Sequence, residues 1–137
     1  MNTQTKEADI DEIYEAVSDY YNGWYEANPE RMRRCLHPDL AKRALTMDGA
    51  GMEYLLNLTK EVMVEATAQG RGSATPAAKH HWTITILDSY AEIATVKVAS
   101  VEYMEYIHLV KQDGRWLIAN VIYTDNRVMQ SADNIVA

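Results

Sequence analysis

Apolar side chains recur every three or four residues along the first part of the chain. This spacing places them on one face of an α-helix, and the opposite face carries acidic and other polar residues. The stripe consists of Ile10, Ile13, Tyr14, Val17, Tyr20, Tyr21 and Trp24. We expect Asp9 to cap this helix, with Glu12 three residues later, and the Asn28-Pro29 step to end it.

Two more helices are predicted before the pattern changes. Asn28 and Pro29 suit the N-cap and the first turn of a short helix that runs to about Leu36. A longer helix is predicted from about Gly51 to Gln69, because its apolar residues repeat the spacing of the first stripe. Between these two helices, residues 40–46 are expected to form a short strand.

From Lys79 onward the apolar period changes to two, which is typical of β-strands. We expect hairpin turns at Asp88–Ala91 and at Gln112–Gly114, and Asp-Gly is the strongest short signal of this kind. Helices followed by strands indicate an α+β domain. The predicted strands are residues 80–87, 92–102, 103–111 and 115–123.

Both faces of the predicted sheet are apolar. On its third strand, Tyr106 and His108 share one face, and Glu105 and Ile107 share the other. An antiparallel sheet with one face in water alternates more cleanly, and the helices can cover only one face. We therefore expect a homodimer in which a second copy covers the other face of the sheet.

Composition and charge narrow the class of protein. The 137 residues suit one domain spanning 1–137, for which we expect a core over about residues 8–125 and frayed ends. A net charge of −7 argues against nucleic-acid binding, which usually begins with a basic stripe. No apolar run is long enough to cross a membrane. Cys35 is the only cysteine; we expect a buried thiol and a cytoplasmic protein without disulfides.

The aromatic residues of this chain all carry a polar atom. There are nine tyrosines, three tryptophans and no phenylalanine. Such rings suit a pocket that both packs against a ligand and forms hydrogen bonds with it. The histidines are not spaced as metal ligands, since His80 and His81 are adjacent on a strand and point to opposite faces. We expect no metal and no other cofactor.

Three segments of the chain, taken in their order, resemble those of the nuclear transport factor 2-like superfamily. Within it, they are most similar to the bacterial branch described as putative lumazine-binding, and the resemblance covers nearly the whole chain. The resemblance implies a cone-shaped, cystatin-like α+β fold in which three N-terminal helices pack on a curved, mostly antiparallel sheet. The segments are Tyr20-Tyr21-Asn22-Gly23-Trp24-Tyr25, Leu36-His37-Pro38-Asp39-Leu40, and Glu105 to Lys111 with the following Gly114 to Ile118.

The resemblance also implies a pocket between the helices and the concave face of the sheet. On that face we expect Tyr106, His108 and Tyr123, and we expect Tyr20 and Trp24 of the first helix to close the pocket. Tyrosine hydroxyls and a histidine in such a place can orient a carbonyl group or a heterocycle. The same rings can also serve only to pack the core.

Three functions remain open at this point. The first is the binding of a small molecule in a hydrophobic pocket lined by Tyr, Trp and His. The second is a SnoaL-like cyclase, isomerase or dehydratase without a cofactor, with His108, His37 or Asp39 as acid or base. Ketosteroid isomerases of this superfamily use a carboxylate base, but a gapless match places Ala44 at that position. The third is a dimeric protein-interaction scaffold.

Overall fold

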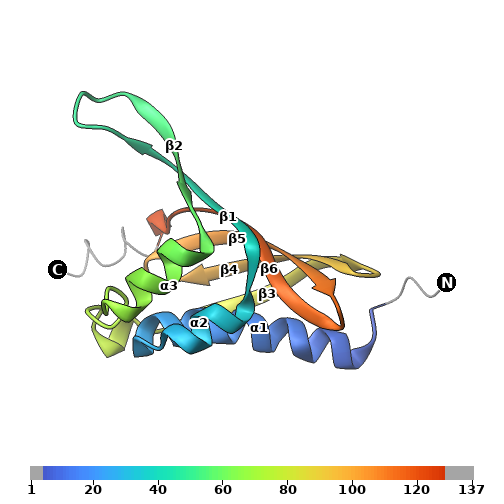
Figure 1. Cartoon of the computed structure of the whole chain (residues 1–137). Helices are drawn as coiled ribbons and strands as arrows, with labels where there is room; N and C mark the ends of the chain where they lie inside the picture. The colour runs from blue at the N-terminus through green and yellow to red at the C-terminus, as the bar shows by residue number, and fades with distance from the viewer. Residues whose placement is uncertain (1–4, 129–137) are drawn as a thin grey trace.

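The computed structural model describes residues 5–128, which form three α-helices and six strands (Figure 1). The frayed tail that the sequence predicts extends beyond residue 128 and there lies outside the described residues. The helices are α1 (Glu7–Glu26), α2 (Pro29–Cys35), α3 (Lys60–Ala68) and the short 3-10 helix η1 (Ala77–Lys79). The strands are β1 (Leu36–Met47), β2 (Glu53–Leu58), β3 (Trp82–Tyr90), β4 (Ile93–Ser100), β5 (Tyr103–Gln112) and β6 (Arg115–Asp125).

The strands join one curved sheet in the order β2-β1-β6-β5-β4-β3. Neighbouring strands are antiparallel except β1 and β6, which run parallel. Figure 1 shows the helices against one face of this sheet, with α1 lying along the long strands, while the β1–β2 hairpin reaches beyond the body of the sheet. This is the α+β fold, with three helices on a mostly antiparallel sheet, that the sequence predicts.

The prediction of one helix from Gly51 to Gln69 is wrong over its first half. That half forms β2, which pairs with β1, and α3 begins only at Lys60. The apolar residues of this segment satisfy both periods, since Leu56 and Leu58 also alternate as strand residues do. Thr59 separates the two elements, because its hydroxyl accepts a hydrogen bond from a backbone N–H of the first turn of α3.

The two predicted hairpin turns have different outcomes. The turn at Gln112–Gly114 is confirmed: Asp113 and Gly114 have φ values of 52° and 77°, the left-handed conformations that a tight hairpin requires. The turn predicted at Asp88–Ala91 is wrong over its first three residues. Residues 88–90 continue β3 and pair with β4, and the chain turns only at Ala91, the last predicted residue, where φ is 48°.

The predicted N-cap of α1 is also wrong. The helix already begins at Glu7, and Asp9 lies inside its first turn. The Asp9 carboxylate accepts hydrogen bonds from Lys111 Nζ at 2.8 Å and from the indole N–H of Trp116 at 3.0 Å. The bond from Lys111 is the main reason why the pKa of Asp9 is lowered. Asp9 therefore fastens the start of α1 to β5 and β6.

The apolar stripe of α1 packs on the concave face of the sheet. Ile13 and Val17 are fully buried there, whereas Tyr14 lies at the margin of the stripe and is 39% exposed. The thiol of Cys35 is buried, as expected. The opposing core residues of the sheet include Val96, Val98, Ile107, Leu109 and Ile118.

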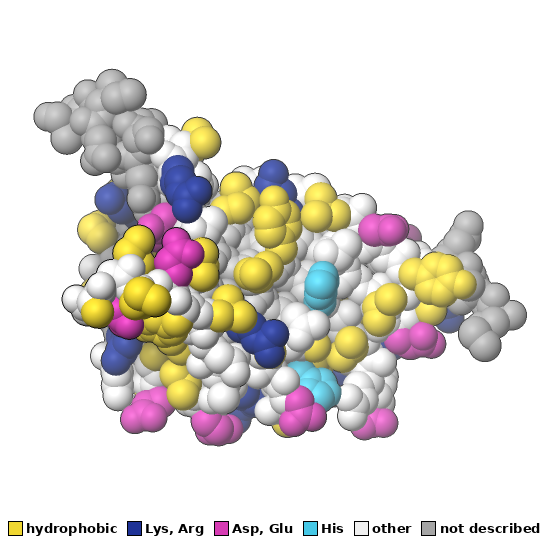
Figure 2. All heavy atoms as spheres, turned by 90° about the horizontal axis from the view of Figure 1, so that it is seen from above, with side chains coloured by type: hydrophobic (Ala, Val, Ile, Leu, Met, Phe, Trp, Pro, Cys, Tyr) yellow, Lys and Arg dark blue, Asp and Glu magenta, His cyan; other side chains and the backbone are white. Residues whose placement is uncertain are grey.

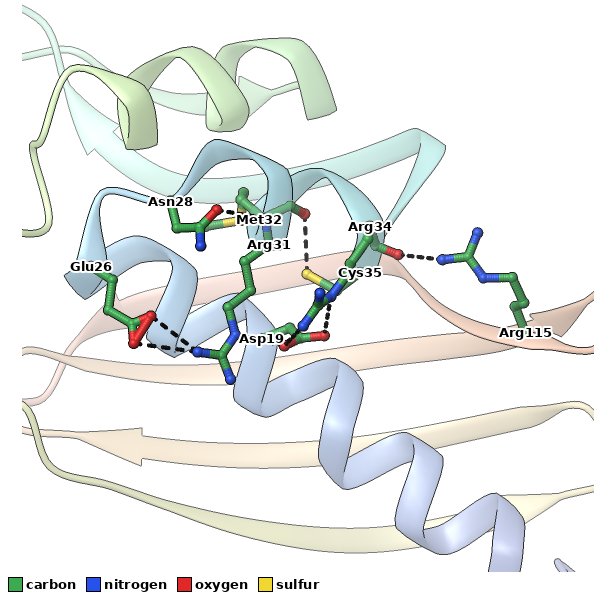
Figure 3. A network of polar contacts seen from close by, with 8 residues as sticks. All are labelled: Asp19, Glu26, Asn28, Arg31, Met32, Arg34, Cys35 and Arg115. Atoms are coloured by element: carbon green, nitrogen blue, oxygen red, sulfur yellow. Dashed lines mark hydrogen bonds and ion pairs between the residues drawn. The ribbon is translucent and has the colours of Figure 1, made fainter.

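A buried carboxylate holds α2 against α1 (Figure 3). Asp19 of α1 accepts a hydrogen bond from Arg31 Nε at 2.7 Å, and its two oxygens also accept from Arg34 at 2.8 and 2.9 Å. Burial alone would raise the pKa of Asp19, but the bonds from Arg34 and Arg31 outweigh it and lower that pKa. Asn28 starts α2 as expected, since its side chain accepts from the N–H of Arg31.

We expect Asp19→Asn to lower the free energy of unfolding by about 1–3 kcal/mol at pH 7, because two arginines lose a buried ionic acceptor. The pKa of Asp19 is lowered in the folded chain from the ordinary value of 3.8. Its contribution is therefore complete above that ordinary value and is lost as the pH falls through the folded pKa. Urea denaturation of both chains at several pH values should show the difference shrinking in acid.

Glu26→Gln is the matched control for this prediction. Glu26 also pairs with Arg31, but its side chain is exposed, so its removal should change stability by less than about 0.5 kcal/mol. Equal losses in the two variants, or a loss in Asp19→Asn that grows in acid, would contradict the assignment.

Candidate functional site

A cavity of about 380 Å³ lies between the helices and the sheet. We call it the cone cavity. Six elements and the turn after α3 contribute to its wall, and most of that wall is aromatic or aliphatic. The residues that line it are Tyr20, Tyr21, Trp24, Tyr25, Lys42, Leu56, Leu58, Val62, Met63, Ala66, Arg71, Tyr103, Glu105 and Tyr123.

A buried carboxylate lies in this wall. Glu105 of β5 is only 2% exposed, and it points toward α1. The hydroxyl of Tyr20 donates to Glu105 Oε2 at 2.9 Å, and the hydroxyl of Tyr21 donates to Oε1 at 2.5 Å. Both carboxylate oxygens therefore have a partner, which offsets the cost of burying the charge.

A buried amine completes the group. Lys42 of β1 donates a hydrogen bond from Nζ to the Tyr20 hydroxyl, and its Nζ lies 3.7 Å from Glu105 Oε2. The same Nζ lies 4.8 Å from the ring centroids of both Tyr20 and Tyr123, within range of cation–π attraction. We call Lys42, Glu105, Tyr20 and Tyr21 the Lys–Glu–Tyr cluster.

Burial shifts the pKa values of the two tyrosines and the lysine of this cluster. It raises the pKa of Tyr20 and of Tyr21 well above 10, and the negative charge of Glu105 adds to the effect. Burial lowers the pKa of Lys42, while Glu105 acts in the opposite direction. Tyr25, farther along α1, has a pKa raised to about 12, first by its burial. At neutral pH all these tyrosines are therefore hydrogen-bond donors.

Aromatic stacking and close packing shape one end of the cone cavity. Tyr21 stacks on Trp82 with ring centroids 5.4 Å apart, and Tyr25 stacks on His80 at 4.0 Å. Gly72 packs directly on Trp24, since an added Cβ would stand 2.3 Å from the Trp24 carbonyl oxygen. The turn after α3 is thereby pressed against α1 beside the cavity.

Three of the five predicted ligand-binding residues line this cavity: Tyr20, Trp24 and Tyr123. The expectation that Tyr106 and His108 lie on the concave face is wrong. Both are exposed on the outer face of the sheet, where His108 lines a shallow groove of about 330 Å³. The residues of β5 alternate between the two faces as predicted, but Glu105 points inward and its neighbour Tyr106 points outward.

Glu105 points inward because its carboxylate finds hydroxyl groups and an amine as partners on that face. A carboxylate such as Glu105 normally remains in water, so hydrophobicity favours the face of Tyr106. Here the tyrosines of α1 and Lys42 of β1 provide its partners, and all three are distant from Glu105 in sequence. The one sequence signal was that Glu105 shares its face with Ile107 and Leu109, which are core residues.

The predicted acid or base candidates lie outside the cone cavity. His37 and Asp39 stand at the start of β1, where His37 Nε2 lies 2.7 Å from Gln112 Oε1. His37 Nδ1 accepts from the backbone N–H of Asp39 at 3.0 Å, so these two residues are not joined through the Asp39 carboxylate. His108 lies on the outer face of the sheet. Within residues 5–128, no histidine lines the cavity.

No group of three or more His, Cys, Asp or Glu side chains within the described residues is arranged to hold a metal ion. No helix among them is both long and apolar enough to span a membrane.

Comparison with known proteins supports the family resemblance. The model of a family described as putative lumazine-binding matches residues 8–124. Among curated proteins, none matches the chain.

Solved structures share the fold at low identity. A nuclear transport factor 2-like protein of unknown function from Silicibacter pomeroyi DSS-3 is 16% identical, with a TM-score of 0.71 over 90% of this chain and 100% of the other. Another, from Methylobacillus flagellatus KT, is 21% identical, with a TM-score of 0.64 over 90% of this chain and 96% of the other. A cystatin-like domain of unknown function from Nostoc punctiforme is 11% identical, with a TM-score of 0.60 over 96% of this chain and 86% of the other. At these identities the likeness establishes the fold alone.

We expect Glu105→Leu to lower the free energy of unfolding by about 3–5 kcal/mol, because it leaves the Lys42 ammonium buried without its counter-charge. The double variant Lys42→Met/Glu105→Leu should regain much of this loss, since it removes both charges together. Urea denaturation of the parent chain, both single variants and the double variant measures the coupling. Additive losses would show that the two charges do not depend on each other.

Proposed function

The chain belongs to the putative lumazine-binding family of nuclear transport factor 2-like proteins, and we propose that it binds an aromatic or heterocyclic small molecule in the cone cavity. The observation that carries this proposal is the Lys–Glu–Tyr cluster in the wall of an otherwise apolar cavity. Small-molecule sites typically combine such a cavity, of about 300–1,000 Å³, with a few placed polar groups.

The lining suggests how a ligand would lie. Trp24, Tyr103 and Tyr123 contribute aromatic rings, and Leu56 and Met63 contribute aliphatic surface, so a flat ring system suits the space. Lys42 has three N–H donors, and the Tyr20 hydroxyl is the acceptor within hydrogen-bond distance. A ligand oxygen such as a carbonyl can accept from a remaining donor. Lumazine, named by the family description, is a heterocycle with carbonyl oxygens and fits this chemistry.

The other two functions receive less support. A scaffold for protein interactions needs no cavity with a polar group in its wall. A cyclase, isomerase or dehydratase that uses His108, His37 or Asp39 would need these residues at the cavity, and all three lie elsewhere. The cytoplasmic location remains a prediction from the sequence.

We expect Ala66→Phe to weaken the binding of lumazine or of benzyl alcohol at least about tenfold, a difference of about 1.4 kcal/mol, because the added ring fills the cone cavity. Ala68→Phe is the matched control, since Ala68 ends the same helix but is exposed and lines no part of the cavity. Isothermal calorimetry with the parent chain and both variants measures the affinities. The proposal is wrong if the parent chain binds neither probe, or if the two variants bind equally well.

We also propose that the outer face of the sheet is the interface of a homodimer. The helices cover the concave face, and Figure 2 shows hydrophobic side chains gathered over the opposite one. A face that exposes several large apolar side chains is characteristic of an interaction site. We infer that the partner is a second copy of this chain, because a two-fold axis brings the same apolar face of two copies into contact. The exposed apolar residues of this face include Leu45, Leu55, Tyr90, Ile93, Tyr106 and Ile122.

The double variant Tyr106→Glu/Ile122→Glu should sediment as a monomer at micromolar concentration, whereas the parent chain should sediment as a dimer, because four like charges would meet in the interface. Tyr14→Glu is the control: Tyr14 is similarly exposed but belongs to α1, on the other side of the sheet. A parent chain that sediments as a monomer overturns the dimer.

A further inference from the structure

We propose that Lys42 is a nucleophilic lysine whose amine forms an imine with an aldehyde or ketone that enters the cone cavity. The inference rests on the proposed function, because it requires that the cavity admits a small molecule. It adds a covalent step and a class of ligand, the carbonyl compounds.

The position of the amine is the first argument. Lys42 is 8% exposed, yet it lines the cone cavity, so what reaches its Nζ must come through that cavity. The centroids of the Tyr20 and Tyr123 rings each lie 4.8 Å from the Nζ. By contrast, Lys111 is used in an ion pair with Asp9 at 2.8 Å, outside the cavity.

The second argument is a path for the proton. An ammonium group cannot attack a carbonyl carbon, so Lys42 must first lose a proton. Its Nζ donates to the Tyr20 oxygen, and the Tyr20 hydroxyl donates to Glu105 Oε2 at 2.9 Å. One proton can pass from Lys42 to Tyr20 while the Tyr20 proton passes to Glu105. The shift turns a buried ion pair into a neutral amine and a neutral acid, and it removes two charges from a poorly solvated place.

Imine formation then needs only the Lys42 amine, the proton on Glu105 and the carbonyl compound. The nitrogen lone pair of Lys42 forms the C–N bond, and the π electrons of the carbonyl move to its oxygen. A proton moves from nitrogen to that oxygen and gives a carbinolamine. The proton held by Glu105 then protonates the hydroxyl, the C–O bond breaks, and water leaves. The products are a protonated imine on Lys42 and the Glu105 carboxylate, so the ion pair is restored.

The second oxygen of Glu105 is held in place during these steps. Tyr21 donates to Oε1 at 2.5 Å, which leaves Oε2 as the oxygen on the path to Lys42. Tyr20 therefore acts as a relay and Tyr21 as a positioning residue.

The test uses benzaldehyde with sodium cyanoborohydride at neutral pH, which reduces an imine to a stable benzylamine. Mass spectrometry of the intact chain and of its peptides locates the benzyl group. We expect Lys42 to be modified at least about tenfold faster than Lys6, which is exposed just before α1 and lines no part of the cavity. Benzyl alcohol, which has the same ring but no carbonyl group, should slow the modification of Lys42 and leave that of Lys6 unchanged.

Two variants test the relay. Tyr20→Phe removes the bridging hydroxyl, and Glu105→Gln removes the proton acceptor; each should slow modification of Lys42 at least about tenfold. Lys42→Arg should abolish it. Thermal unfolding of each variant identifies those that retain the fold, and Tyr20→Phe changes the fewest atoms. Unchanged modification of Lys42 in a folded Tyr20→Phe chain overturns the relay.

Calorimetry with benzyl alcohol separates the two proposals. If benzyl alcohol binds the parent chain but Lys42 reacts no faster than Lys6, the imine is overturned and the binding function stands. If benzyl alcohol and lumazine do not bind, and Lys42 also reacts no faster than Lys6, both are overturned. Fast modification of Lys42 that benzyl alcohol suppresses supports both.

Discussion

The buried ion pair between Lys42 and Glu105 determines how the rest of this fold is arranged. Two charges in an apolar wall require partners, and the tyrosines of α1 supply them from the opposite layer. The pair therefore fixes the position of α1 over the sheet, the face of β5 that turns inward, and the approach of β1 to the cavity. A buried pair contributes little net stability, but either charge alone would be costly, so the arrangement specifies one packing rather than many.

The sequence predicts local elements well because their signals are local. The stripe of α1, the Asn28 cap and the Asp-Gly turn depend on neighbours within a few residues, and each appears in the structure. The family resemblance supplies the fold. The sequence does not predict the part of the cavity wall that β2 supplies, Leu56 and Leu58, because residues 51–58 satisfy both helix and strand periods, and only pairing with β1 decides between them.

The candidate site was predicted only in part for a different reason. A β-bulge between His108 and Leu109 shifts the register of β5 against β6 by one residue, so Ile118 and Tyr123 both face inward although strict alternation would separate them. No alternation rule applied to a single strand can detect such a shift. The inward face of Glu105 likewise depends on partners more than sixty residues away in the chain. The helix contribution, from Tyr20 and Trp24, is predicted because spacing gives the apolar face of the helix and the family resemblance implies a pocket against it.

The parallel pairing of β1 with β6 has a consequence for how the chain folds. β1 begins at Leu36, while β6 runs from Arg115 to Asp125, so the centre of the sheet joins segments from opposite ends of the chain. Contacts of such long sequence separation slow folding, because the intervening loop must close before the contacts stabilise anything. During synthesis on the ribosome, β1 can pair with β2 once both have emerged, but this hairpin can join the rest of the sheet only after β6 has emerged. The amine of Lys42 therefore reaches its buried position at the end of folding, when the cavity closes around it.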